Sequence, residues 1–207
     1  MSLVDFRISL NKHTGTVPEE IFKIRTLQFL TLFGNSFTGQ LPNSQWSFTN
    51  LLFFEIFNNK LSGTIPVEAT KMQKLITFKI NNNLFRGTLP DFSNCFQLSD
   101  FYVHDNDLSG KLTNFGRLFS LVNFAVSRNN FHGSLNDVFR IPLPKLQVAD
   151  FNDNQFTGKL PAALFNSAVL GLFTASENCM DGEIPPDICL SRNLTYLGIS
   201  GMTVSPQ

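Results

Sequence analysis

The sequence has 207 residues, with 16 Lys and Arg against 16 Asp and Glu, so its formal net charge is zero; 43% of the residues are hydrophobic and 15% are charged. Zero net charge without a basic run argues against nucleic-acid binding, which needs clustered Lys and Arg. No apolar stretch of about 18 residues is present, so no segment of the sequence is expected to span a membrane. The length suits one elongated domain, which we place at residues 1–207.

The sequence is built from a repeat. An asparagine recurs every 23 to 25 residues and a glycine follows four residues after each one. The asparagines are Asn11, Asn35, Asn59, Asn83, Asn106, Asn129, Asn154 and Asn178. Repeats of this length form stacked solenoids, because one repeat buries too little apolar surface to be stable alone. We count about eight repeats and a ninth strand that begins at Leu194.

Each repeat opens with a predicted strand. In the segment that starts at Leu27 (LQFLTLF), apolar and other residues alternate, as in a strand with one buried face. Leu30 and Leu32 are expected to face the core, and Phe29 and Phe33 to face the other way. The same positions in the next repeat are Phe53 and Phe57.

The repeated asparagine follows the strand, where the chain bends. Its side-chain amide can bond backbone groups that the bend leaves unpaired, so Asn35, Asn59, Asn83, Asn106, Asn129, Asn154 and Asn178 are predicted to form an internal ladder. Removing one rung should cost about 1–3 kcal/mol of stability, whereas Asn82, beside Asn83, is expected to tolerate alanine within about 0.5 kcal/mol. The glycine is expected to supply a backbone conformation or a close approach that a side chain would block.

The second half of each repeat returns the chain to the next strand. In the segment from Glu19 (EEIFKIRTL), Ile21, Ile24 and Leu27 are three residues apart, which predicts a short 3₁₀ or helical turn. Cys95 occupies an inward position of such a segment and is expected to be a small buried hydrophobic residue.

The segment L-x-G-x-(I/L)-P, for example LSGTIP from Leu61, closes most repeats. It resembles the plant-type leucine-rich repeats of receptor-kinase ectodomains and polygalacturonase inhibitors. The resemblance implies an α/β-type repeat solenoid: a right-handed superhelix with a concave parallel β-sheet, short 3₁₀ or helical convex turns, and a second set of short strands. Here phenylalanine takes many positions where the family has leucine, such as Phe54, Phe78, Phe101 and Phe124.

The two ends show no capping segments, although a solenoid needs capped ends. We therefore expect a segment of a longer protein that lacks one or both caps. Members of this family often carry a disulfide near the end of the solenoid, and Cys179 and Cys189 are the candidate pair; two reduced thiols are an equally open alternative. Asn193 begins the single glycosylation sequon of the sequence, Asn-Leu-Thr.

Patterns of catalytic residues are missing. The sequence has no H-E-x-x-H, C-x-x-C, G-x-S-x-G or phosphate-loop motif, and its three histidines occupy different repeat positions. The DFNDN segment at Asp150 has glutamine where a calcium loop needs glycine. We therefore expect no enzyme activity, no cofactor and no metal.

Recognition is expected on the outward positions of the strands. Phe29, Phe33, Phe53 and Phe57 form a two-by-two aromatic block there, more than scattered surface residues require. The later repeats are acidic, with Asp100, Asp105, Asp150, Asp153 and Glu177. The predicted ligand-binding residues are Phe29, Phe33, Phe53, Phe57, Lys79, Tyr102, His104 and Asp150.

These observations favour a non-catalytic module that binds a protein or peptide on its concave face, in a secreted or membrane-anchored receptor-like protein on the extracellular or lumenal side of a membrane. Two alternatives stay open. One is a structural accessory subunit in a larger complex, and the other is a secreted inhibitor of a wall-degrading enzyme.

Overall fold

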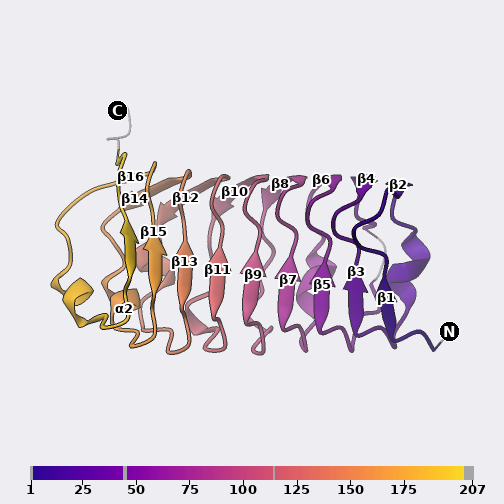
Figure 1. The fold of residues 1–207 in the computed structure, drawn as a ribbon, viewed down its shortest axis with the longest axis horizontal. Helices are drawn as coiled ribbons and strands as arrows, with labels where there is room; N and C mark the ends of the chain where they lie inside the picture. The colour runs from indigo at the N-terminus through magenta and orange to yellow at the C-terminus, as the bar shows by residue number, and fades with distance from the viewer. Residues whose placement is uncertain (1, 44–45, 114, 203–207) are drawn as a thin grey trace.

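The computed structural model describes residues 2–43, 46–113 and 115–202, and two parallel sheets run along its whole length (Figure 1). The strands that open the repeats pair in chain order into a nine-stranded sheet. They are β1 (Asp5–Arg7), β3 (Phe29–Thr31), β5 (Phe53–Glu55), β7 (Thr77–Lys79), β9 (Asp100–Tyr102), β11 (Asn123–Ala125), β13 (Val148–Asp150), β15 (Leu172–Thr174) and β17 (Tyr196–Gly198).

The strands that follow each asparagine form a second sheet of eight strands. They are β2 (Thr14–Gly15), β4 (Ser36–Gln40), β6 (Lys60–Gly63), β8 (Leu84–Thr88), β10 (Asp107–Lys111), β12 (Asn130–Ser134), β14 (Gln155–Gly158) and β16 (Cys179–Met180). This sheet matches the second strand set that the sequence resemblance implies.

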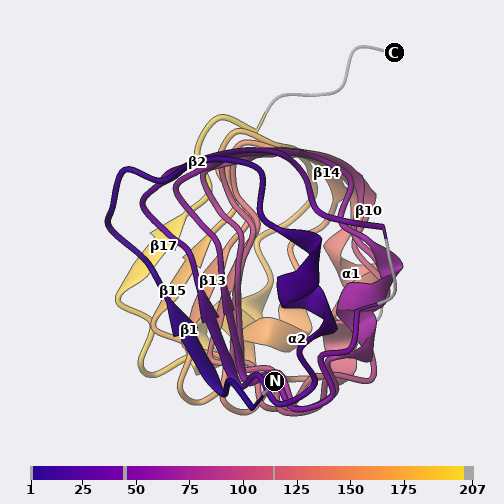
Figure 2. The ribbon, with the colours of Figure 1, turned by 90° about the vertical axis from the view of Figure 1, so that its right-hand side faces the viewer.

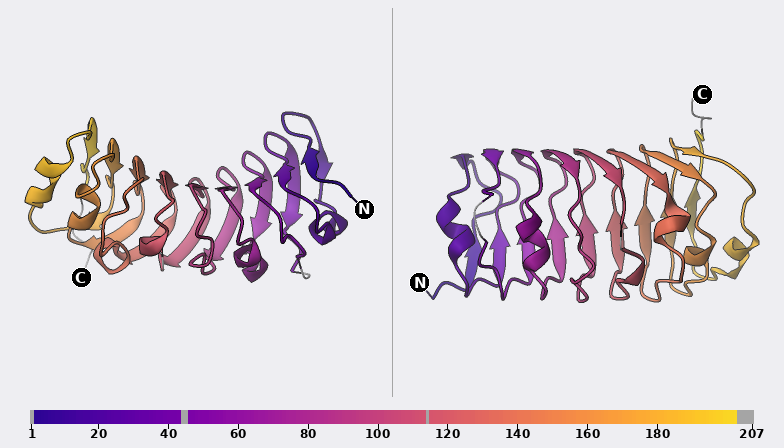
Figure 3. Two further views of the ribbon diagram at one scale, coloured as in Figure 1. Left: turned by 90° about the horizontal axis from the view of Figure 1, so that it is seen from below. Right: turned by 180° about the vertical axis from the view of Figure 1, so that it is seen from behind.

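Short helical turns close the repeats on the side opposite the nine-stranded sheet (Figure 2). Four are 3₁₀ turns: η1 (Glu19–Lys23), η2 (Val67–Lys71), η3 (Phe115–Arg117) and η4 (Pro186–Leu190). Two are single α-turns, α1 (Leu135–Val138) and α2 (Ala162–Phe165). The stack is curved, and the nine-stranded sheet lies along the inner side of the curve (Figure 3). The predicted solenoid with a concave parallel sheet is confirmed.

A column of phenylalanine rings fills the core behind the concave sheet. Phe54, Phe78, Phe101 and Phe124 follow one another on neighbouring strands, with ring centroids 5.5 Å apart at each step and planes within 15° of parallel. All four are at most 1% exposed. Stacked aromatic pairs contribute beyond the area that they bury, so phenylalanine in this position strengthens the contact between repeats.

The repeated asparagines form a ladder beside this core. Asn83 Oδ1 accepts a hydrogen bond from the Leu61 N–H at 3.0 Å, and its Nδ2 donates to the carbonyls of Ile56 at 3.1 Å and Ile80 at 3.0 Å. The same bonding pattern is made by Asn35, Asn59, Asn106, Asn129, Asn154 and Asn178. Each rung therefore joins its own repeat to the preceding one.

The residue before each asparagine has a left-handed backbone, which the sequence analysis did not anticipate. Its φ lies between +50° and +67° at Leu10, Gly34, Asn58, Asn82, Asp105, Arg128, Asp153 and Glu177. Left-handed φ is unfavourable for residues other than glycine, and asparagine and aspartate tolerate it best. The expectation that Asn82 is freely replaceable is therefore wrong, because alanine would be strained there.

The repeated glycine has both properties that were expected of it. Gly63 has a φ of +80°, and a Cβ added to it would lie 2.7 Å from Cγ of Gln40 in the preceding repeat. At Gly39 the corresponding atom is Cγ2 of Thr16, at 2.8 Å. A side chain from one repeat thus packs over the glycine of the next.

Candidate functional site on the concave sheet

The aromatic block lies at the N-terminal half of the concave sheet. Phe29 stacks on Phe53 with centroids 5.0 Å apart and planes 12° apart, and Phe33 stacks on Phe57 at 4.4 Å and 5°. All four rings are half-buried. The sequence predicted them to be outward-facing, and the structure adds that they cover one another in two parallel stacks.

The residues between the two stacks belong to the central column of the sheet. Thr31 is only 6% exposed, and the Glu55 carboxylate lies 3.5 Å from the Lys79 ammonium. The Arg7 guanidinium sits over the Phe29 ring, 4.5 Å from its centroid. The block is therefore two apolar stacks with a polar central column between them.

Lys79 links the aromatic block to the polar half of the sheet. Its ammonium also lies 5.3 Å from the centroid of Tyr102, a distance at which a cation is attracted to the ring face. Burial, and then the nearby Asp100 carboxylate, raise the pKa of Tyr102. The Tyr102 hydroxyl is protonated at neutral pH, as in an ordinary tyrosine, and can donate a hydrogen bond to a ligand.

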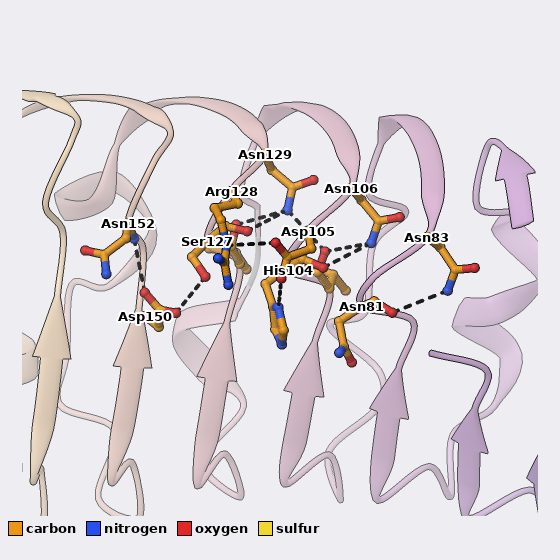
Figure 4. A network of polar contacts seen from close by, with 12 residues as sticks. Asn81, Asn83, His104, Asp105, Asn106, Ser127, Arg128, Asn129, Asp150 and Asn152 are labelled. Carbon is orange, nitrogen blue, oxygen red and sulfur yellow. Dashed lines mark hydrogen bonds and ion pairs between the residues drawn. The ribbon is translucent and has the colours of Figure 1, made fainter. Parts of the chain in front are cut away.

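His104, Asp105 and Arg128 form a cluster just beyond the ends of β9 and β11 (Figure 4). The Asp105 carboxylate lies 2.6 Å from His104 Nδ1 and 2.7 Å from Arg128 Nε. Both Asp105 and Arg128 have the left-handed backbone that precedes a ladder asparagine. That conformation turns the two side chains toward one another over the bend.

Asp150 is the centre of a second cluster. Its Oδ2 accepts a hydrogen bond from the Ser127 hydroxyl at 2.6 Å, and its Oδ1 accepts one from the Asn152 N–H at 3.2 Å (Figure 4). Oδ1 also accepts a hydrogen bond from the Thr174 hydroxyl at 2.7 Å. Both carboxylate oxygens are thus occupied by neighbours. Asp150 contributes charge to the face and fixes the side chains beside it.

The structure brings the predicted binding residues into two groups on one sheet. The four phenylalanines and Lys79 form the first, while Tyr102, His104 and Asp150 lie in the second. Sequence reasoning missed Arg128, Ser127 and Thr174, which hold the acidic side chains in place. Arg128 had a usable signal, since it occupies the position before a ladder asparagine, where Asp105 stands one repeat earlier.

The cysteines are separate thiols in this structure. Cys95 is buried, Cys179 is half-buried and Cys189 is exposed. Burial, and then the Asp91 carboxylate, raise the pKa of Cys95 to about 11, so its reactive thiolate is scarce at neutral pH. A disulfide between Cys179 and Cys189 stays a prediction, as does glycosylation of the exposed Asn193.

Metal-ligand clusters and membrane-spanning helices are absent from the part of the chain that the structure describes. No group of three or more His, Cys, Asp or Glu residues there is placed to hold a metal ion. None of the helices in that part has the length and apolar character needed to cross a bilayer.

Two parallel sheets joined by an asparagine ladder define a leucine-rich-repeat solenoid. Comparison with family models finds no match, and neither does comparison with curated protein sequences. Solved structures do match. A crystal structure of PEPR1–AtPEP1 is 30% identical over 93% of this chain and 28% of that chain, with a TM-score of 0.85. A TDR receptor is 28% identical over 95% of this chain and 34% of that one, with a TM-score of 0.90.

The Arabidopsis receptor kinase HAESA, solved in complex with the peptide hormone IDA and the co-receptor SERK1, is 28% identical over 96% of this chain and 37% of that chain, with a TM-score of 0.76. This chain is a leucine-rich-repeat protein of the plant type. It spans about a third of the length of these receptor structures.

Proposed function

We propose that the chain is a non-catalytic recognition module that binds a protein or peptide across its concave sheet. The observation that carries the proposal is the pair of phenylalanine stacks. Four half-buried apolar rings, on β3 and β5 and just beyond their ends, form two adjacent stacks. Contiguous apolar surface of this kind marks contact sites, and buried aromatic residues supply much of the energy at binding surfaces.

The polar half of the sheet supports a directional mode of binding. The acidic side chains of this half are Asp100, Asp105, Asp150, Asp153 and Glu177, and the arginine described beside them is Arg128. A ligand with an apolar segment and a basic segment would complement the two halves, since complementary charge guides orientation and association. The solved complex of HAESA with a peptide hormone supports the idea of a peptide ligand.

The setting of this module is part of the proposal. The receptor kinases that it resembles suggest a receptor-like protein that is secreted or anchored in a membrane, with the solenoid on the extracellular or lumenal side. A larger complex that includes further protein partners is compatible with this setting.

The test uses a random peptide library displayed on phage and selected on the wild-type protein. Bound peptides are then synthesised, and their footprint is mapped by changes in the amide chemical shifts of the protein. We expect the largest changes in β3 and β5, continuing toward β13, and peptides that combine apolar and basic residues. A footprint confined to the second sheet, or no selected peptide on the concave sheet, would refute the proposal.

A further inference from the structure

The repeats differ in length at one place, on the convex side. From the repeated glycine to the next concave strand there are 14 residues in most repeats, as from Gly39 to Phe53. The interval is 13 residues in the fourth and fifth repeats, Gly87 to Asp100 and Gly110 to Asn123, and 15 in the sixth, Gly133 to Val148. The sheets stay in register through these repeats. The convex turns therefore absorb the whole change in length.

A hollow of about 850 Å³ lies at this irregularity. It is lined by all three convex segments, through Ser93, Asn94, Phe96, Gly116, Arg117, Asp137, Val138, Arg140 and Ile141. The hollow thus lies where two shortened convex turns are followed by a lengthened one. The hollow is on the face opposite the proposed ligand site.

The hollow is lined in part by apolar side chains that are exposed and do not belong to the buried core. Phe96 is 63% exposed and Ile141 is 43% exposed. Phe119, at the position equivalent to Phe96 one repeat later, is 48% exposed. This position lies two residues before the leucine that precedes each concave strand. In four other repeats it is polar, as Arg25, Thr49, Gln73 and Arg192. The phenylalanine content of the core therefore does not account for Phe96 and Phe119.

The floor of the hollow is closely packed. A Cβ added to Gly116 would lie 2.1 Å from the carbonyl oxygen of Val138. Only glycine lets the backbone of the sixth repeat approach the fifth this closely. The turns of the fifth and sixth repeats are therefore in close contact at the hollow.

The charge at the rim is positive. Arg117 and Arg140 stand at the hollow, with Asp137 as the one acidic residue in its lining. Asp137 lies 3.8 Å from Arg140, and both side chains are 75% exposed, so this ion pair is weak. Arg117 has no ion pair among the residues that the structure describes. An acidic group would complement this rim.

We propose that the hollow binds a second protein partner through a short segment that places an aromatic or aliphatic side chain beside one or more acidic residues. The apolar side chain packs between Phe96 and Ile141, and the acidic residue pairs with Arg117. This site is independent of the concave sheet. It would let the module bind two partners on opposite faces.

The same displayed peptide library tests this proposal. Peptides selected on the wild-type protein are passed over the double variant Phe96→Ser/Ile141→Ser, and those that bind the variant are removed. The remaining peptides, which bind only the wild type, are synthesised. We expect them to combine acidic with aromatic or aliphatic residues. We also expect them to bind the double variant at least tenfold more weakly and Arg117→Glu at least fivefold more weakly, by calorimetry.

Matched variants separate this result from a general effect. Val67→Ser removes an apolar side chain with the same 63% exposure as Phe96, and Arg86→Glu reverses an exposed arginine on the second sheet. Both should leave affinity unchanged, as should Phe53→Ser/Phe57→Ser on the concave sheet. The proposal is overturned if no wild-type-dependent peptide is obtained, if the selected peptides are basic, or if Arg117→Glu binds them as well as the wild type does.

Discussion

Single residues hold neighbouring repeats together at two adjacent positions. The ladder asparagine satisfies backbone groups of two repeats at once, and Asn83 does so while only 7% exposed. The residue before it accepts a left-handed backbone so that the chain can bend. The ladder position thus depends on side-chain hydrogen bonding, and the position before it depends on backbone conformation. Different substitutions at the two positions distinguish these contributions.

Replacement of Asn83 by alanine tests the ladder. Alanine leaves the Leu61 N–H and the carbonyls of three residues, Ile56, Ile80 and Asn81, without this partner, so the free energy of unfolding should fall by about 1–3 kcal/mol. Asn94→Ala, at an exposed position, should change it by less than about 0.5 kcal/mol. Urea denaturation of both variants measures the difference, and equal effects would contradict the assignment.

Replacement of Asn82 tests the left-handed position. Asn82 is exposed and has a φ of +54°, so alanine should cost about 1 kcal/mol through backbone strain. Glycine has no such strain and should stay within about 0.5 kcal/mol of the wild type. The same denaturation experiment applies. If alanine and glycine behave alike, backbone conformation does not control this position.

Thiol labelling tests the environments of the cysteines. Cys95 is buried and its pKa is raised to about 11, so at pH 8 it should react with iodoacetamide far more slowly than the exposed Cys189. The reactivity of Cys95 should appear only on unfolding. Mass spectrometry of peptides from briefly labelled protein gives the order, and fast labelling of Cys95 in the folded protein would contradict its buried position.

At the scale of the element, the strands are regular and the convex turns are variable. The phenylalanine column binds each concave strand to the next, while the turns behind it differ in length and in helix type. Phe96 lies on a convex turn and Phe101 on the concave strand that follows it, and the two side chains are 63% and 0% exposed. They show that one residue type has two roles here, in the core and on the surface.

Alanine at these two positions separates the roles. Phe101 contacts four other rings at 5.0–5.5 Å, so Phe101→Ala should cost about 3–5 kcal/mol. Phe96→Ala removes an exposed ring and should cost less than about 0.5 kcal/mol. Thermal unfolding of the two variants gives the comparison. Comparable losses would mean that Phe96 belongs to the core.

At the scale of the whole molecule, the periodicity of the sequence predicted the solenoid, and the resemblance to plant-type leucine-rich repeats implied its concave sheet and its second strand set. Asn83 and Gly63 were predictable because each repeat imposes the same backbone requirement on them. The left-handed backbone of Arg128 and Leu10 was not predictable, because that position accepts several residue types and no single residue recurs there. The convex hollow was missed for a related reason: a change of one residue in repeat length has no meaning until the turns are placed in space.

The central claim is that the concave aromatic block is the ligand-binding surface, and affinity measured on Phe53→Ser/Phe57→Ser tests it most directly. Titration of a peptide selected on the wild-type protein should show a loss of at least about 2 kcal/mol of binding free energy, because aromatic residues at the centre of an interface dominate affinity. Both rings are half-buried on the outer face of the sheet, so the variant should remain folded by circular dichroism. Unchanged affinity for every selected peptide, or loss of folding in place of loss of binding, would contradict the account.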